Sequence, residues 1–295
     1  MTKLSDLGDY GTYGTACPAA ADVRPVRRPG AMTTGTHLIY VPFNSAGVPS
    51  GVARMPAAVQ EAGVEDLLPA PVSATWIRTD NLRSERGPSA LLAEEALTAM
   101  IVDTAAAVRA AWDVGARPLV IAGDCPVLLA PLIAAGEAGL VFIDGHEDAW
   151  DPRTGPTGEA SDSEIGLALG HYPGPAGLDG LPCLHARYLA VLGPRDQEEI
   201  AEAGQSSVRG LVHAYLDGPQ LAGEPEPHSY TEVGELVAVG PAAAPAGWWC
   251  HVDLDVLATG ELAAVDYPQA PTGSPHRSLP AGARLSGRQR GHLQP

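Results

Sequence analysis

Three short segments of the chain place aspartate, histidine and cysteine side chains directly after buried, strand-like runs. These segments are GDC at 123–125, DGHED at 144–148 and HVDLD at 251–255. Side chains at every second position of an extended chain share a face. The two aspartates and the histidine of DGHED are therefore expected to converge on one side, as are the two aspartates of HVDLD.

Carboxylates that meet in one strand-end crevice repel one another strongly unless cations neutralise them. Two divalent metal ions would provide that charge, and mixed carboxylate and imidazole ligands suit Mn²⁺, with Zn²⁺, Fe²⁺, Co²⁺ or Ni²⁺ as alternatives. A metal pair also offers a bridging hydroxide, which is a strong nucleophile near neutral pH. A single aspartate at a strand end is more often a turn former or helix cap, so this prediction depends on the joint arrangement.

The elements that must position these segments alternate along the chain. Apolar runs bounded by turn residues predict strands at 37–43, 118–122, 140–143, 188–192 and 248–254. Apolar residues at helical spacing predict a long helix at 89–112 and shorter ones at 127–135, 161–169 and 196–203. This alternation indicates an α/β fold, with three α-β-α layers around a mainly parallel sheet. Ligands bind such sheets beyond the carboxyl ends of the strands, where all the segments lie.

Composition narrows the classes of function. The formal net charge is −17 and the pI is about 4.8, so nucleic acids and anionic membranes are poor partners and a small cationic substrate fits better. No apolar run reaches the roughly 18 residues of a membrane span, and no secretory signal pattern begins the chain, which indicates a cytoplasmic protein. The four cysteines are scattered without CxxC spacing, which argues against a disulfide framework or a structural zinc site.

Length and composition favour one large domain between two ends of different character. Residues 1–31 lack periodicity and are interpreted as a disordered extension or a misassigned start. Residues 32–271 are assigned to the α/β metallohydrolase domain, and residues 272–295 to an irregular basic tail of disorder-like composition. Because a domain that ends on a ligand-bearing strand lacks a last covering helix, we hypothesise a truncated or frame-shifted C-terminus.

The order of the three segments resembles the arginase, agmatinase and formimidoylglutamase family, the ureohydrolases, whose pattern is GGDH, DAHxD and SxDxD. The resemblance extends from about His37 to Thr272. It implies an arginase-like fold and a homo-oligomer, either a trimer or a hexamer. It also implies an amidinohydrolase with two metal ions, in which a metal-bridging hydroxide attacks a guanidino or amidino compound and releases urea, or an amide, and an amine.

The resemblance further implies roles for individual residues. One metal ion would be held by Cys125, Asp144, Asp148 and Asp253. The other would be held by His146, Asp144, Asp253 and Asp255. Asp148 would be the catalytic residue, because it would orient the hydroxide and help to relay its proton.

The chain departs from the family pattern at Cys125, where the family has a histidine. A thiolate is softer than an imidazole, which favours Zn²⁺ or Fe²⁺ relative to Mn²⁺. The hydroxyarginine amidinohydrolase of cycloserine biosynthesis, a member of the family, has the same cysteine. Its HxDxDVL strand is also similar to residues 251–257 of this chain.

The predicted substrate contacts also depart from arginases. Thr157, Gly158 and Glu159 stand where arginases have the Ser-Gly-Asn loop that grips the substrate's α-carboxylate. Glu159 would repel a carboxylate and attract an ammonium, so we expect weak activity on arginine. Ser161 stands in place of a histidine proton shuttle and does not titrate near pH 7, which favours a hydroxylated guanidine or another substrate with a better leaving group. Glu198 falls where the family has a carboxylate that reaches the substrate's amino group.

Two other interpretations stay open at this point. The chain is alternatively a non-catalytic, metal-binding relative of the family, or a hydrolase of another C–N bond on the same fold. His251 shares a strand face with Asp253 and is interpreted as an ordinary strand residue in preference to one that supports a ligand. Trp248 and Trp249 are expected to pack in the core.

Overall fold

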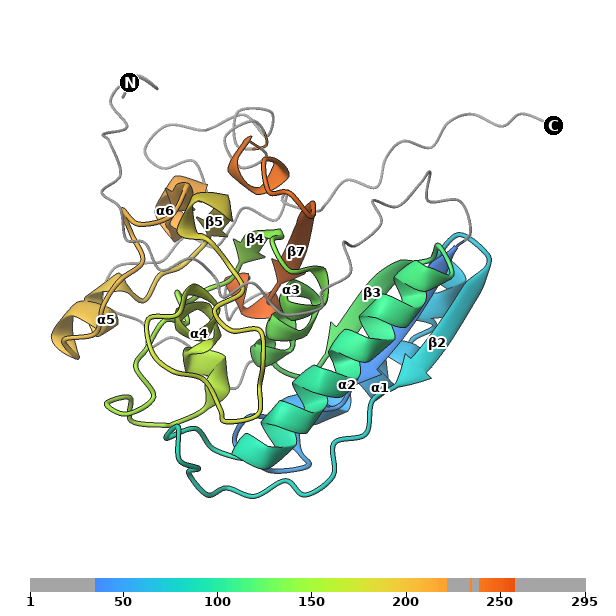
Figure 1. Ribbon diagram of the computed structural model, residues 1–295, viewed down its shortest axis with the longest axis horizontal. Coiled ribbons are helices and arrows are strands. Elements are labelled where there is room, and N and C mark those ends of the chain that lie inside the picture. The colour runs from blue at the N-terminus through green and yellow to red at the C-terminus, as the bar shows by residue number, and fades with distance from the viewer. Residues whose placement is uncertain (1–34, 222–233, 235–238, 258–295) are drawn as a thin grey trace.

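The computed structural model describes residues 35–221, 234 and 239–257, and its strands form two parallel sheets (Figure 1). The order in the first sheet is β2 (Val72–Trp76), β1 (Thr36–Val41) and β3 (Arg117–Ala122). The order in the second sheet is β6 (Ala214–Leu216), β5 (Leu189–Leu192), β4 (Gly139–Ile143) and β7 (Trp248–Val252).

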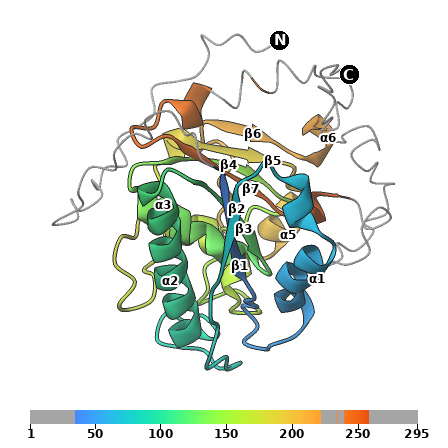
Figure 2. The same cartoon turned by 90° about the vertical axis from the view of Figure 1, so that its right-hand side faces the viewer.

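Helices cover these strands on two sides. They are α1 (Met55–Glu61), α2 (Glu94–Asp113), α3 (Leu129–Ala135), α4 (Glu164–Leu169), α5 (Gln197–Glu202) and α6 (Gly218–Leu221). Figure 2 shows α2 and α3 on one side of the strands and α1 and α5 on the other. The expected α/β fold with parallel strands between helical layers is therefore confirmed.

Several boundaries differ from the expected ones for local reasons. The helix expected from residue 89 begins only at Glu94, because Ala90 and Ala93 have positive φ angles of 68° and 49° that interrupt a helix. Strands β2 and β6 and helix α1 were not predicted. β2 is largely exposed and β6 has only 3 residues, so neither carries a buried apolar run of the kind that predicts a strand.

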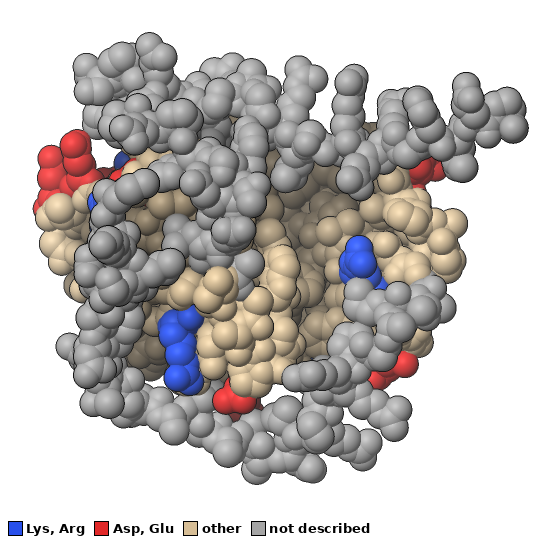
Figure 3. Space-filling model, turned by 90° about the horizontal axis from the view of Figure 1, so that it is seen from above, with Lys and Arg blue, Asp and Glu red and all other residues tan. Residues whose placement is uncertain are grey.

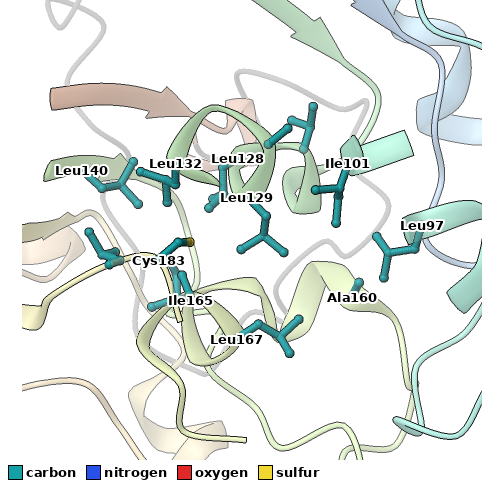
Figure 4. Packing of buried hydrophobic residues seen from close by; sticks show 14 of the residues in the cluster. Leu97, Ile101, Leu128, Leu129, Leu132, Leu140, Ala160, Ile165, Leu167 and Cys183 are labelled. Carbon is teal, nitrogen blue, oxygen red and sulfur yellow. The ribbon is translucent and has the colours of Figure 1, made fainter. Parts of the chain in front are cut away.

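The main hydrophobic core lies between the helices and the strands that carry the candidate site. Leu128, Leu129 and Leu132, from the turn before α3 and from α3 itself, are no more than 1% exposed. Figure 4 shows them beside apolar side chains of α2 and α4, namely Leu97, Ile101, Ile165 and Leu167. Burying one such side chain contributes about 1.5–3 kcal/mol. This packing holds the turn that begins at Cys125 against α4.

The register of the second sheet brings the predicted site segments together. Ile143, the last residue of β4, pairs with Leu192 of β5 on one side and with Val252 of β7 on the other. Because these strands are parallel, their carboxyl ends lie at the same edge of the sheet. The segments 144–148 and 253–255 therefore begin side by side.

On the face drawn in Figure 3, acidic side chains of the described residues gather at the left edge beside basic ones, and the other charged side chains lie singly. Within the described ranges, no helix combines the length and apolar character that crossing a bilayer requires.

The expectation that Trp248 packs in the core is wrong, because 56% of it is exposed on β7, whereas Trp249 packs against the core. Residues 1–31 and 272–295 lie outside the described residues.

Candidate metal centre

Hydrogen bonds across the ends of β4 and β7 hold two of the predicted segments together. The Asp253 amide donates to the Ile143 carbonyl at 2.8 Å, and the Gly145 amide donates to Asp255 Oδ1 at 2.9 Å. A Cβ at position 145 would lie 2.7 Å from the Arg195 guanidinium and 3.0 Å from the Asp255 carbonyl oxygen, so a side chain here would crowd the contact between the two segments. The two acidic segments are thus fixed by backbone contacts as well as by side chains.

His146 lies between two carboxylates at this edge. Its Nδ1 atom is 2.8 Å from Asp255 Oδ2 and 3.6 Å from Asp144 Oδ1, and its amide donates to the same Asp144 oxygen at 2.8 Å. Burial by itself lowers the pKa of His146, but the hydrogen bonds to the two carboxylates outweigh it and raise the pKa well above 6.5. This arrangement offers one nitrogen and two oxygen ligands to a cation.

Cys125 reaches the same place from the end of β3, in the other sheet. The side chain of Asp124 accepts a hydrogen bond from the Cys125 amide at 3.0 Å, which sets the direction of the turn. Cys125 Sγ then lies 2.7 Å from Asp253 Oδ2 and 3.9 Å from Asp144 Oδ2. Burial, followed by these carboxylates, raises the pKa of the thiol well above 9.0. A thiolate therefore requires a cation at this position.

Asp148 is joined to α4 by its backbone. Its φ angle is 47°, and its carbonyl accepts hydrogen bonds from the Ile165 amide at 2.9 Å and the Gly166 amide at 3.4 Å. This contact brings Glu164, the first residue of α4, next to Asp148. Burial, followed by the charge of Glu164, raises the pKa of Asp148 well above 3.8.

Glu164 is fully buried, and neither of its carboxylate oxygens has a hydrogen-bond partner among the described residues. Burial raises the pKa of Glu164 well above 4.5, and the Asp144 carboxylate adds to this effect. Another buried carboxylate of the chain, by contrast, has several hydrogen-bond partners. Glu147 is equally buried, but it accepts hydrogen bonds from Ser207, the Val208 amide and Tyr215.

The potential ligand atoms fall into three overlapping groups, and within each group all the atoms lie within 4.8 Å of one another. The first group consists of Cys125, Asp144, His251 and Asp253. The second consists of Cys125, Asp148 and Glu164. The third consists of Asp144, His146 and Asp255.

The structure thus brings together all the ligands predicted from the sequence and adds two more, Glu164 and His251. Position 251 had a sequence signal, because it alternates with Asp253, but it was favoured as an ordinary strand residue. Position 164 had no signal, because only the folding of the intervening loop carries it to Asp148.

The expected reason for the convergence was partly wrong. β4 ends at Ile143 and β7 ends at Val252, so the acidic residues that follow are not in extended strands. Asp148 has a left-handed backbone conformation, and Asp255 lies in a 3-10 turn whose first residue follows Asp253. Turns, rather than strand alternation, aim these carboxylates at one point.

The donor set fits divalent cations. Burial is the largest cause that raises the pKa values of Asp144, Asp148 and Glu164, and neighbouring carboxylates raise them further. The buried Nε2 atom of His251 also has no hydrogen-bond partner among the residues that the structure describes. Carboxylate, imidazole and thiol groups gathered in this way are typical ligands of Mn²⁺, Zn²⁺ and Fe²⁺.

The loop predicted to contact the substrate lies between the metal ligands and α4. The Thr157 hydroxyl bonds to the Asp162 carboxylate and accepts a hydrogen bond from the Glu159 amide at 3.1 Å. Gly158 is buried with a φ angle of 76°, and a Cβ there would meet the Arg86 guanidinium at 2.6 Å. Glu159 is partly exposed, so its carboxylate is within reach of a small solute.

The two other residues discussed with the substrate lie in different surroundings. Ser161 accepts a hydrogen bond from the Ser45 hydroxyl at 3.0 Å, and the Ser45 amide donates to Asp124 at 2.7 Å. Ser161 thus lies beside the turn that carries the cysteine ligand. Glu198 is exposed in the first turn of α5. Its predicted contact with a substrate amino group stays a prediction.

No protein-family model and no curated protein sequence matches the chain. Solved structures match, including an arginase from Bacillus caldovelox with a TM-score of 0.63 and 22% identity over 81% of this chain and 82% of that one. The chain has the arginase fold. An arginase from Bacillus subtilis matches at a TM-score of 0.61 and 20% identity over 81% and 80% of the two chains. The agmatine ureohydrolase of Thermoplasma volcanium matches at a TM-score of 0.55 and 15% identity, over 85% of this chain and 78% of that one.

Proposed function

We propose that this chain is an amidinohydrolase with two metal ions, which converts a guanidino or amidino compound into urea, or an amide, and an amine. The observation that carries the proposal is the convergence of three potential metal-ligand groups at the carboxyl ends of the parallel strands. Arginase and agmatine ureohydrolase structures share this fold, and their names state the reaction class. The proposal assigns the same class to this chain.

The two ions, when bound, would polarise the substrate and activate a water molecule near neutral pH. Asp144 offers oxygens toward both Cys125 and His146, so it suits a position shared by the two ions. Asp253 lies in the Cys125 group, and a shared position for it is implied by the family resemblance. Asp148 would orient the attacking water and hold its proton, because its carboxylate is buried beside the ligands with no cationic partner of its own. The backbone contact to α4 would keep that carboxylate in place.

The charge around the site supports a cationic substrate. The chain has a formal net charge of −17, and the candidate centre adds several buried carboxylates to that background. Glu159 lies on the loop beside the centre, and its charge contributes to the raised pKa of Asp124. We infer that Glu159 favours an ammonium or guanidinium group over a carboxylate, and therefore that arginine is a poorer substrate than agmatine, which lacks the carboxylate. Hydroxyarginine is favoured over arginine for a different reason, because its better leaving group needs a proton shuttle less.

The experiment that tests this function combines metal analysis with product detection. The purified protein, loaded with Mn²⁺ or Zn²⁺ and freed of excess metal, is expected to hold about two ions per chain. Urea release is then measured with arginine, agmatine and guanidinobutyrate, and hydroxyurea release with hydroxyarginine, whose hydroxyl stays on the released fragment. Metal binding with amine release but neither urea nor hydroxyurea would instead indicate a hydrolase of another C–N bond. Absence of both metal and product would favour the non-catalytic alternative.

Substituting one shared ligand gives a sharper test. Asp144→Asn should abolish urea release and reduce metal content together, because an amide is a far weaker cation ligand than a carboxylate. Asp151→Asn is the matched control, since Asp151 pairs with Arg153 at 2.6 Å rather than with the candidate ligands. Full activity in the Asp144→Asn protein would exclude the proposed centre.

A further inference from the structure

The imidazole of His251 has a nitrogen atom that the site as predicted from the sequence does not use. His251 lies on β7, and its Nε2 atom is buried without a hydrogen-bond partner among the described residues. Leaving a buried polar atom unpaired is unfavourable, so native structures normally supply a partner. The surroundings of this nitrogen therefore indicate what the partner is.

The imidazole lies at the candidate metal centre. One of its ring nitrogens and the ligand atoms of Cys125, Asp144 and Asp253 all lie within 4.8 Å of one another. The opposite strand holds the ring in this position, because His251 pairs in register with Phe142 and stacks on it with ring centroids 5.3 Å apart and planes inclined by 14°. The imidazole is thus fixed before any ligand binds.

We propose that His251 is a metal ligand that supplies, from the neighbouring strand, the imidazole that Cys125 replaces. This inference rests on the proposed function, because it assigns a ligand to one of the two metal positions. The position would then have sulfur, nitrogen and carboxylate donors, a set that suits Zn²⁺ better than Mn²⁺. The position of Asp144, His146 and Asp255 has only nitrogen and oxygen donors. The two positions are therefore expected to prefer different metal ions.

Electrostatics favours His251 over Glu164 as the additional ligand. Glu164 also approaches Cys125, in the group that includes Asp148. However, the cysteine thiolate and the aspartates already bring several negative charges to this position, and a further carboxylate would increase their mutual repulsion. A neutral imidazole adds a donor without adding charge.

The test uses a variant that keeps the ring and removes its nitrogen. His251→Phe preserves the stacking on Phe142, and Cys250→Ala is the matched control because Cys250 is the exposed neighbour on the same strand. Metal per chain, Zn²⁺ affinity and the thiolate-to-metal absorption band of the Co²⁺-loaded protein are compared. Wild type and the Cys250→Ala variant should hold about two ions, whereas His251→Phe should bind at least roughly tenfold more weakly at the Cys125 position and lose or shift the band.

The outcomes separate this inference from the proposed function. Unchanged stoichiometry, affinity and Co²⁺ spectrum in His251→Phe, with two ions in wild type, would overturn the role of His251 alone. Failure of the wild-type protein to bind metal would overturn both. Loss of the Cys125-position metal in Glu164→Gln but not in His251→Phe would also overturn the inference, in favour of the carboxylate.

A measurement on the wild-type protein covers the case in which His251→Phe fails to fold. The chain has 9 histidines, and labelling them with ¹⁵N allows the nitrogen bonded to a ¹¹³Cd ion to be identified by its coupling. Cadmium coupling is expected at Nδ1 of His146 and at Nε2 of His251. Coupling at His146 alone would overturn the proposal.

Discussion

At the scale of single residues, Glu147 and Glu164 show how two buried carboxylates acquire different roles. Both are fully buried. The Glu147 carboxylate accepts hydrogen bonds from a serine, a tyrosine and a backbone amide, and it ties the loop after β4 to residues around β6. The Glu164 carboxylate has no such partner among the described residues and lies beside Cys125 and Asp148. Burial alone therefore does not mark a carboxylate as available to a cation, whereas burial without partners beside other ligand atoms does.

This contrast predicts that a glutamate-to-glutamine substitution has a larger effect on the stability of the metal-free protein at position 147 than at position 164. Glu147→Gln should lower the free energy of unfolding by about 2 kcal/mol. The substitution replaces a charged carboxylate that accepts three hydrogen bonds with a neutral amide that has one acceptor oxygen. Glu164→Gln should change it by less than about 1 kcal/mol, because no partner is lost. Urea unfolding in the presence of a chelator measures both. Equal losses would show that Glu164 has a structural partner of its own.

At the scale of elements, the candidate centre is assembled by the turns that follow the strands. The loop after β4 passes through the left-handed Asp148, and the end of β7 continues into the 3-10 turn Leu254–Val256. The turn after β3 depends on Gly123, where an added Cβ would lie 2.4 Å from the Phe43 carbonyl oxygen and 2.6 Å from the Val52 carbonyl oxygen. Backbone atoms cannot move aside as flexible side chains can, so this glycine fixes the approach of Cys125.

We expect Gly123→Ala to displace that turn. The variant should be less stable than wild type by roughly 2–3 kcal/mol, as for overpacking, and should bind the Cys125-position metal more weakly. Gly204→Ala is the control, because Gly204 has a φ angle of 65° but no atom within 4 Å of an added Cβ, so it measures only backbone strain. Thermal unfolding with and without Zn²⁺ compares the two. A Gly123→Ala protein as stable as the control would show that the backbone around Phe43 and Val52 shifts easily.

At the scale of the whole molecule, the candidate centre joins the two sheets. Cys125 follows β3 of the first sheet, whereas the other predicted ligands follow β4 and β7 of the second. Without cations, this junction concentrates carboxylates whose charged forms are disfavoured. Metal binding and the stability of the fold are therefore expected to be coupled. The cytoplasmic location and the trimer or hexamer stay predictions.

The coupling predicts how pH affects the metal-free protein. Burial raises the pKa of Asp124 and of Asp196 from 3.8 to about 6, and it raises those of Asp144, Asp148 and Glu164 well above their usual values. A carboxyl whose pKa is raised by folding keeps its proton longer in the folded state than in the unfolded state. Stability should therefore fall as pH rises from about 4 through about 6, by on the order of 3 kcal/mol for each of Asp124 and Asp196.

The measurement is the melting temperature between pH 4 and 7 with a chelator, and then with Zn²⁺ or Mn²⁺. Asp255 opposes the trend: burial raises its pKa, but the hydrogen bond and charge of His146, the Gly145 amide and the charge of Arg195 together outweigh burial and lower the pKa. Bound metal should remove most of this decrease in melting temperature. The ligands lose their protons as pH rises, and the deprotonated ligands bind cations more tightly. A metal-free melting temperature that increases toward neutral pH would contradict the raised pKa values of these buried carboxyls.

The sequence by itself determined the α/β class, the strands that end in acidic segments and six candidate ligands, from Cys125 to Asp255. Apolar runs and strand-end positions are local features, so they can be interpreted without knowledge of distant contacts. Only the tertiary structure decided that Glu164 and His251 lie beside these candidate ligands. Glu164 arrives through the backbone contact between Asp148 and α4, and His251 is aimed by its register with Phe142. Such proximity depends on how loops close and strands pair, and residue spacing along the chain does not specify it.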